Sequence, residues 1–186
     1  MPSPDDKPRI SPERLREIRV DTHVTYGKEF LRAGRYEDAC AAFDKALEID
    51  AGDVRALAGR SLALTRLGRY DEALAAAAEI FRLEPNNPYG YNAQAVAYHA
   101  MGLAAEAEQA FVKALQFGPD NAAHYYNFAC FWAARDEPER CRENLAQALE
   151  RDPRLNVLAA TDVDMRKFRD EPWFQQLVAF HPSEES

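Results

Sequence analysis

Residues 54–85 read VRALAGRSLALTRLGRYDEALAAAAEIFRLEP, and residues 88–119 read PYGYNAQAVAYHAMGLAAEAEQAFVKALQFGP. The two stretches place small, aromatic and turn-forming residues in the same order, 34 residues apart. This spacing also relates residues before and after them: Gly34, Gly68, Gly102 and Asp136; Ala39, Ala73, Ala107 and Cys141; Ala51, Pro85, Pro119 and Pro153. A period of this length indicates stacked helical hairpins, here from Val20 to Pro153.

Each repeat predicts two helices, because its apolar residues recur three and four positions apart. The glycine between the helices permits the left-handed turn that ends the first, and the proline after the second cannot continue it. One position of the first helix is always small, so that the second helix can approach closely; it holds Gly27, Ser61, Ala95 and Ala129. We therefore expect four antiparallel helical hairpins.

This order of residues resembles the tetratricopeptide repeat family over residues 20–153. The departures are Arg60, Ala77, Ala104 and Pro138, where the family has apolar or aromatic residues, and they suggest local repacking. The resemblance implies an all-α, right-handed superhelical solenoid of antiparallel helix pairs. It also implies an inner face, lined mainly by the first helix of every repeat, that holds extended peptides or helices of other proteins.

The ends of the chain depart from the repeat. Residues 1–10 are rich in proline and charge, which predicts a flexible leader. Ser11, Pro12 and Glu13 are suited to an N-cap and a first helical turn, so the first helix should run from about Ser11 to Ala33. The predicted organisation is a leader (1–10), a four-repeat array with an extended first helix (11–153), a C-terminal helical cap (154–180) and a flexible tail (181–186). The ending, with Thr161-Asp162-Val163-Asp164 and residues 168–174, also resembles that of many bacterial proteins of this family.

Composition limits the partners of the chain. It has 23 Lys and Arg against 31 Asp and Glu, a net charge of -8, which opposes general binding to nucleic acids or anionic membranes. The N-terminus has no apolar block that could act as a secretory signal, and no stretch is long and apolar enough to cross a bilayer. The expected location is cytoplasmic.

The residues do not predict catalysis. Cys40, Cys130 and Cys141 lack the spacing of metal ligands, and we expect them to be reduced and mostly buried. No histidine has a carboxylate, serine or cysteine partner that the repeat would bring beside it, and no glycine-rich phosphate loop is present. We expect no enzymatic activity, no cofactor and no metal.

The inner face remains as the candidate binding site. Helical periodicity assigns to it four cations in the first half and apolar or aromatic residues in the second. The predicted site is Lys28, Arg32, Arg55, Leu62, Arg66, Tyr89, Asn92, Val96 and Tyr126. Because these cations are opposite in sign to the chain as a whole, the site predicts a partner segment that is acidic and apolar, with Asn92 bonding its backbone.

Structural roles compete with this interpretation. Arg32 and Arg66 lie in last helical turns, where a cation stabilises the helix dipole without a ligand. Arg55 is more informative because it lies near a helix N-terminus. Tyr89 and Tyr126 could instead fill the space between repeats. The lysine and asparagine clamp with which some members of the family grip the carboxylate end of chaperones has no counterpart here.

The leading hypothesis is a non-enzymatic scaffold or adaptor that binds an extended segment or helix of another protein. The alternative is a secretion-type chaperone that holds a substrate protein and dimerises through its N-terminal helix, with Leu15 and Ile18 at the contact. The expected oligomeric state is a monomer or a weak homodimer. An end-to-end scaffold is a third possibility.

Overall fold

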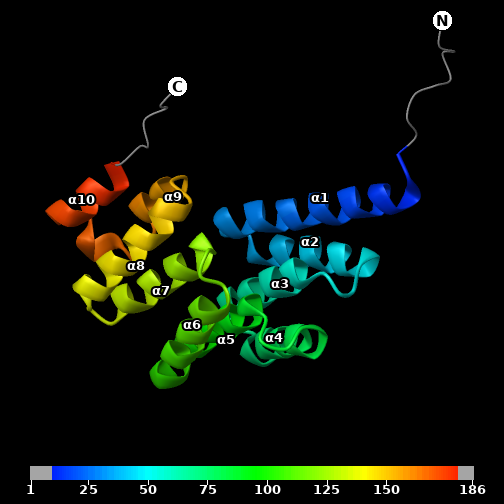
Figure 1. Cartoon of the computed structure of the whole chain (residues 1–186), viewed down its shortest axis with the longest axis horizontal. Coiled ribbons are helices and arrows are strands. Elements are labelled where there is room, and N and C mark those ends of the chain that lie inside the picture. Colours follow the sequence, from blue (N-terminus) through cyan, green and yellow to red (C-terminus); the bar gives the residue numbers. More distant parts are fainter. Residues whose placement is uncertain (1–9, 180–186) are drawn as a thin grey trace, which may run out of the picture. The chain divides into compact units, whose positions relative to one another are not determined.

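The computed structural model describes residues 10–179, and this part of the chain is all-α and contains no strand (Figure 1). Four consecutive helix pairs follow the four predicted repeats, which confirms the expected fold class of paired helices. The pairs are α1 (Pro12–Arg32) with α2 (Tyr36–Ile49), α3 (Val54–Arg66) with α4 (Tyr70–Leu83), α5 (Pro88–Ala100) with α6 (Ala104–Phe117), and α7 (Ala122–Ala134) with α8 (Pro138–Arg151). The predicted leader and tail fall almost wholly outside the described residues.

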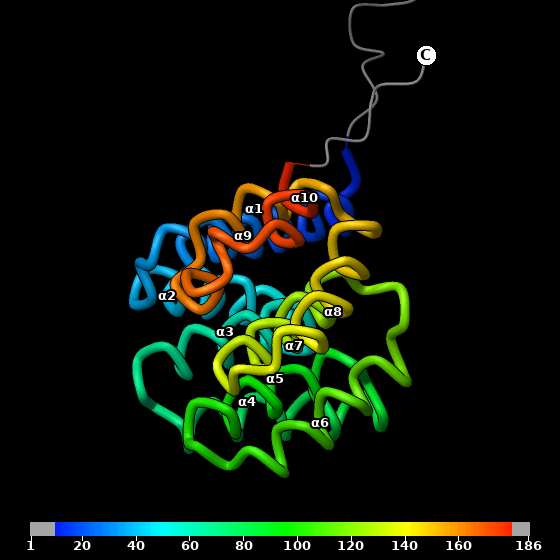
Figure 2. The backbone as a smooth tube through the Cα atoms, turned by 90° about the vertical axis from the view of Figure 1, so that its left-hand side faces the viewer, coloured from blue at the N-terminus to red at the C-terminus, as the bar shows by residue number. Residues whose placement is uncertain are grey.

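The chain divides into two compact units, which meet in sequence at Pro85 and Asn86. In unit 1, α1 packs against α2 and α3, and α3 packs against α4. In unit 2, α5 packs against α6 and α7, and α7 packs against α8. The backbone trace in Figure 2 lets the reader follow how the chain reverses between the helices of each pair.

Local sequence explains where the helices begin and end. Ser11 caps α1 by accepting a hydrogen bond from the backbone N–H of Arg14, and Pro12 occupies the first turn, as predicted. The turn glycines adopt the left-handed conformation, with φ of 71° at Gly34 and 75° at Gly68. The fourth repeat has Asp136 at this position, also with a positive φ of 64°.

Phe43 organises the core of unit 1. Its ring is fully buried and lies against both Gly27 of α1 and Gly59 of α3. A Cβ atom built on Gly27 would lie 2.6 Å from the ring, closer than side chains pack, and one built on Gly59 would also overlap it. The close approach expected at Gly27 is thus present, and Phe43 is the side chain that requires it.

The core of unit 2 is an aromatic cluster. Phe111 of α6 stacks on Phe128 of α7, and Phe131 meets the Trp132 ring edge-on with centroids 4.8 Å apart. All four side chains are buried. Phe128, Phe131 and Trp132 all lie on α7, so this helix supplies three of the four rings.

Three short helices follow the last pair: α9 (Leu155–Thr161), the 3-10 helix η1 (Arg166–Phe168) and α10 (Pro172–Ala179). Both α9 and α10 pack against α8 and against each other. Met165, Phe168 and Phe174 are buried in the core of unit 2. This segment therefore covers apolar surface of the fourth helix pair.

Candidate protein-binding surfaces

The cationic part of the predicted site lies on two packed helices of unit 1. Lys28 and Arg32 are one turn apart on α1, and Leu62 and Arg66 are one turn apart on α3. The three cations are exposed and Leu62 is partly buried. We call these four residues, together with Arg55, the α1–α3 face.

The charges of the α1–α3 face act on one another. The pKa of Lys28 is lowered, first by partial burial of its ammonium group and then by the positive charges of Arg55 and Arg32. Repulsion of this kind means that Lys28, Arg32 and Arg55 share one region of the surface. Asp53 and Asp21 oppose this effect, because their negative charges raise the pKa of Lys28.

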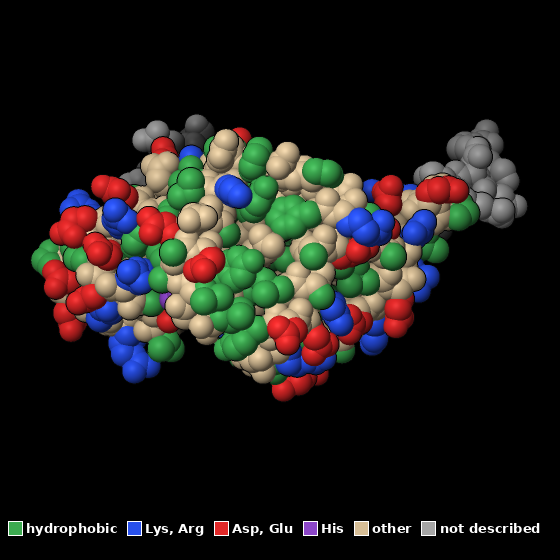
Figure 3. All heavy atoms as spheres, turned by 90° about the horizontal axis from the view of Figure 1, so that it is seen from below, with side chains coloured by type: hydrophobic (Ala, Val, Ile, Leu, Met, Phe, Trp, Pro, Cys, Tyr) green, Lys and Arg blue, Asp and Glu red, His purple; other side chains and the backbone are tan. Residues whose placement is uncertain are grey.

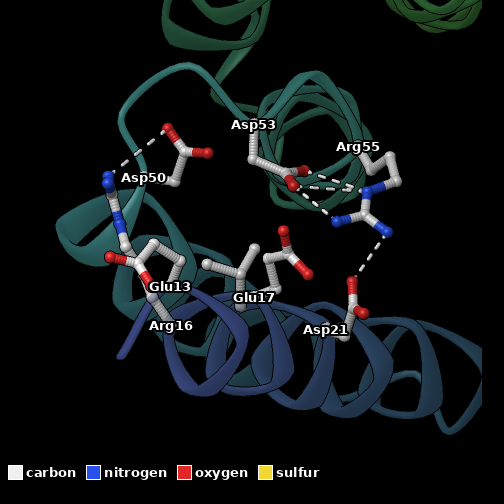
Figure 4. A pocket seen from close by; sticks show the side chains of 8 residues that line it. Glu13, Arg16, Glu17, Asp21, Asp50, Asp53 and Arg55 are labelled. Atoms are coloured by element: carbon white, nitrogen blue, oxygen red, sulfur yellow. Dashed lines mark hydrogen bonds and ion pairs between the residues drawn. The ribbon is translucent and has the colours of Figure 1, made fainter. Parts of the chain in front are cut away.

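Arg55 has partners within the chain (Figure 4). Its Nη1 lies 2.8 Å from Oδ1 of Asp21 on α1, and its Nη2 lies 2.6 Å from Oδ2 of Asp53. Asp53 also caps α3, because its Oδ1 accepts a hydrogen bond from the backbone N–H of Ala56. Arg55 is therefore held by two carboxylates, which offset the unfavourable helix dipole and reduce the charge that it offers to a ligand.

A hollow of about 410 Å³ lies beside this ion pair, and its lining is mainly acidic. In it Arg16 contacts Asp50 at 3.9 Å and donates two hydrogen bonds to the carbonyl of Ile49. The lining is Glu13, Arg16, Glu17, Val20, Asp21, Asp50, Asp53 and Arg55 (Figure 4). This acidic hollow was not predicted; the 34-residue spacing of Arg16 from Asp50, and of Asp21 from Arg55, is the signal in the sequence that could have revealed it.

The predicted site residues of unit 2 are divided between surface and interior. Tyr89 is exposed, with its ring meeting the His124 ring edge-on, and Val96 is partly buried. Asn92 and Tyr126 are each only 5% exposed.

The expectation that Asn92 and Tyr126 face a ligand does not fit this structure, because both side chains are used internally. Oδ1 of Asn92 accepts a hydrogen bond from Asn127, and the Tyr126 hydroxyl donates one to Asp162 at 2.7 Å. Asp162 lies 36 residues beyond Tyr126, outside the repeats, so helical periodicity could not reveal this contact.

One face of the described part of the chain carries charges of both signs. On the face drawn in Figure 3, Lys and Arg side chains lie among Asp and Glu, with hydrophobic side chains gathered between them. Within residues 10–179, no helix combines the length and the apolar character needed to cross a membrane.

Comparison with known proteins agrees with the helix pairs. Models of the tetratricopeptide repeat match residues 30–97 and 89–121. No curated protein sequence matches the chain. Among solved structures, a thermophilic tetratricopeptide repeat protein of Thermus thermophilus is similar with a TM-score of 0.64 and 19% identity, covering 86% of each chain.

Two further structures show the same architecture. Pseudomonas aeruginosa pilF has a TM-score of 0.55 and 20% identity, over 88% of this chain and 75% of its own. The first such domain of human RPAP3 has a TM-score of 0.51 and 17% identity, over 71% and 96%. At these identities the likeness concerns the fold. The sequence matches, the helix pairs and these structures together show that the chain belongs to the tetratricopeptide repeat family.

Proposed function

We propose that the chain is a non-enzymatic adaptor whose α1–α3 face binds an acidic, partly apolar segment of another protein. Tetratricopeptide repeats are typically protein-interaction modules, so a protein–protein interaction scaffold is the general function of this fold. The observation that carries the specific proposal is the cation cluster of Lys28, Arg32 and Arg55: burial, followed by the positive charges of the two arginines, lowers the pKa of Lys28. In a chain of net charge -8, a local cluster of cations attracts an anionic segment of a partner.

The chemistry of the α1–α3 face assigns roles to its residues. Lys28, Arg32 and Arg66 would each bind a carboxylate of the partner, and Leu62 would contact an apolar side chain between those carboxylates. Arg55, already paired with Asp21 and Asp53, would add long-range attraction more than a direct contact. Tyr89 and Val96 offer a separate apolar surface within unit 2.

The test is charge reversal on the α1–α3 face that leaves the Arg55 network intact. We expect Lys28→Glu with Arg32→Glu to lose the partner in affinity purification from the source cells, followed by mass spectrometry. The control is Lys45→Glu with Arg142→Glu, which changes the net charge by the same amount at exposed positions of α2 and α8. This variant should retain the partner. If the face variant folds by circular dichroism and keeps every partner, this binding site is wrong.

A second function is favoured by a different surface. Leu15 and Ile18 on α1 are 51% and 38% exposed, and Tyr26, on the same side of the helix, is 51% exposed. This side lies opposite the buried Val20 and Val24. We propose it as the contact of a homodimer, as the secretion-type chaperone hypothesis requires.

Light scattering tests the dimer. The hypothesis requires a mass of twice 21.0 kDa that returns to 21.0 kDa in Leu15→Asp with Ile18→Asp. A wild-type chain that stays monomeric at high concentration would remove the chaperone hypothesis and leave the adaptor untouched.

We also propose a cytoplasmic location. Cys40, Cys130 and Cys141 are free, buried thiols, as a reducing compartment permits. Fractionation of the source cells would test this, and recovery outside the cytoplasmic fraction would contradict it.

A further inference from the structure

A thiol and two carboxylates meet in unit 2, beside α7. The Sγ atom of Cys130 and one carboxylate oxygen each of Asp162 and Asp164 all lie within 4.8 Å of one another. Cys130 is on α7, whereas the two aspartates lie in the loop that follows α9. The cluster therefore joins the fourth repeat to the segment after the repeats.

Hydrogen bonds hold the loop in place around Asp162. Its Oδ1 accepts from the backbone N–H of Asp164 at 2.9 Å, and its Oδ2 accepts from the Tyr126 hydroxyl at 2.7 Å. The guanidinium of Arg169 donates to its backbone carbonyl at 3.2 Å. Since Tyr126 precedes Cys130 by one helical turn, the tyrosine orients the Asp162 carboxylate beside the thiol.

Two of the three ligand atoms are separated by nearly the distance found around a small divalent cation, and all three lie within 4.8 Å of one another. Sγ of Cys130 lies 3.9 Å from Oδ2 of Asp162. Sulfur and oxygen ligands of a tetrahedral zinc ion, at the usual bond lengths, are about 3.5 Å apart. A side-chain adjustment of a few tenths of an ångström would therefore place both atoms on one ion.

The burial and the charge of these side chains also favour a bound cation. Cys130 is only 7% exposed, and both aspartates are partly buried. Asp162 and Asp164 bring two carboxylates beside this buried thiol. Negative charge gathered in a partly buried place is stabilised by a cation.

We propose that Cys130, Asp162 and Asp164 form a site for a thiophilic divalent cation of the zinc class. The three side chains supply three ligands, a water completes the tetrahedron, and Tyr126 holds Asp162 from outside. On binding, the Cys130 thiol releases its proton to solvent and the sulfur binds as thiolate. The ion ties the loop after α9 to α7. This departs from the expectation of no metal, because no sequence motif brings residues 32 apart together.

Cobalt(II) substitution tests the site in the untagged, metal-free, full-length chain. We expect one Co²⁺ per chain, a thiolate-to-cobalt charge-transfer band, and loss of the band when Zn²⁺ is added. Zinc should also raise the melting temperature of the chain. Cys130→Ser should abolish the band, and Asp162→Asn should weaken cobalt binding at least tenfold.

Two matched variants separate this site from ordinary thiol or carboxylate binding. Cys40→Ser removes a thiol of unit 1, and Asp170→Asn removes an exposed carboxylate of unit 2; both should bind cobalt as the wild type does. The proposal fails if no band forms, if Cys40→Ser removes it, or if Asp162→Asn and Asp164→Asn both leave affinity unchanged. In the last case Cys130 binds as an isolated thiol, and its contact with Asp162 is a structural hydrogen bond only.

Discussion

At the scale of single residues, the strictest steric requirement lies at Gly27 and Gly59. The buried Phe43 ring occupies the space that a side chain at either position would need. Neither glycine has a positive φ, so the requirement comes from packing and not from backbone conformation.

We predict that Gly27→Ala destabilises the chain by about 1–3 kcal/mol, because the new methyl group forces Phe43 to move within a filled core. The measurement is urea denaturation followed by circular dichroism. Gly52→Ala is the control, since its Cβ would meet only Oδ1 of Asp50 at 3.7 Å and should change stability little. Equal stability of the two variants would show that the core accommodates the methyl group.

The buried side chain of His124 should make the free energy of unfolding depend on pH. Its side chain is 1% exposed, and burial lowers its pKa to about 4, partly offset by the backbone of Gly118 and Ala114. Between pH 6.5 and 4 the unfolded chain binds the proton and the folded chain does not. The free energy of unfolding therefore falls as pH falls, by about 3 kcal/mol in total from this residue.

Denaturation at several pH values checks this prediction. His124→Phe should reduce the decrease in the free energy of unfolding between pH 6.5 and 4. His23→Gln, at a partly buried position of α1, should leave that decrease unchanged. A wild-type slope that survives in His124→Phe would assign the effect to other groups.

At the scale of elements, α7 carries the core of unit 2 through Phe128, Phe131 and Trp132. We predict that Trp132→Ala costs about 3–5 kcal/mol, the usual range for removing a buried indole. Chemical denaturation measures it, and a loss below about 1 kcal/mol would contradict the tight packing of this ring.

The turn between α7 and α8 offers a gain in stability. Asp136 holds a positive φ where the other repeats have glycine, and this conformation costs a residue with a side chain about 1 kcal/mol. Asp136→Gly should raise the free energy of unfolding by about that amount. Asp136→Ala, which loses the same 2.9 Å contact with Lys167 but keeps a Cβ, should not.

The helices could be predicted from sequence because their signals are local. Ser11 and Pro12, the turn glycines and the apolar spacing each act within a few residues. The contacts of the site residues depend on residues far away in the sequence. Asp21 pairs with Arg55 of the next repeat, and Asp162, which lies beyond the repeats, accepts a hydrogen bond from Tyr126. Residues 34 apart lie at equivalent points of neighbouring helix pairs, which explains the first contact but not the second.

At the scale of the whole molecule, the chain has two compact units, and both of its tryptophans, Trp132 and Trp173, lie in unit 2. The division into an array (11–153) and a cap (154–180) stays a proposal. Helical repeats contact mainly their neighbours, so destabilisation of one unit need not spread to the other.

We therefore predict that Gly27→Ala shifts the urea transition seen by circular dichroism more than the transition seen by tryptophan fluorescence. Trp132→Ala, in unit 2, should instead shift the fluorescence transition more than the transition seen by circular dichroism, with Trp173 as the remaining fluorophore. Coincident transitions by both methods in Gly27→Ala would mean that the two units unfold together.

The contact of Phe43 with Gly59 also limits how this array could be rearranged. Repeat proteins are often treated as interchangeable modules, but here the ring of the first repeat also needs the space that Gly59 of the second repeat leaves. The residue equivalent to Gly59 in the third repeat is Ala93, and in the fourth it is Asn127. A recombined chain that joined the first repeat directly to the third would press Phe43 against a methyl group, so we expect it to be less stable than a chain that keeps the first two repeats together.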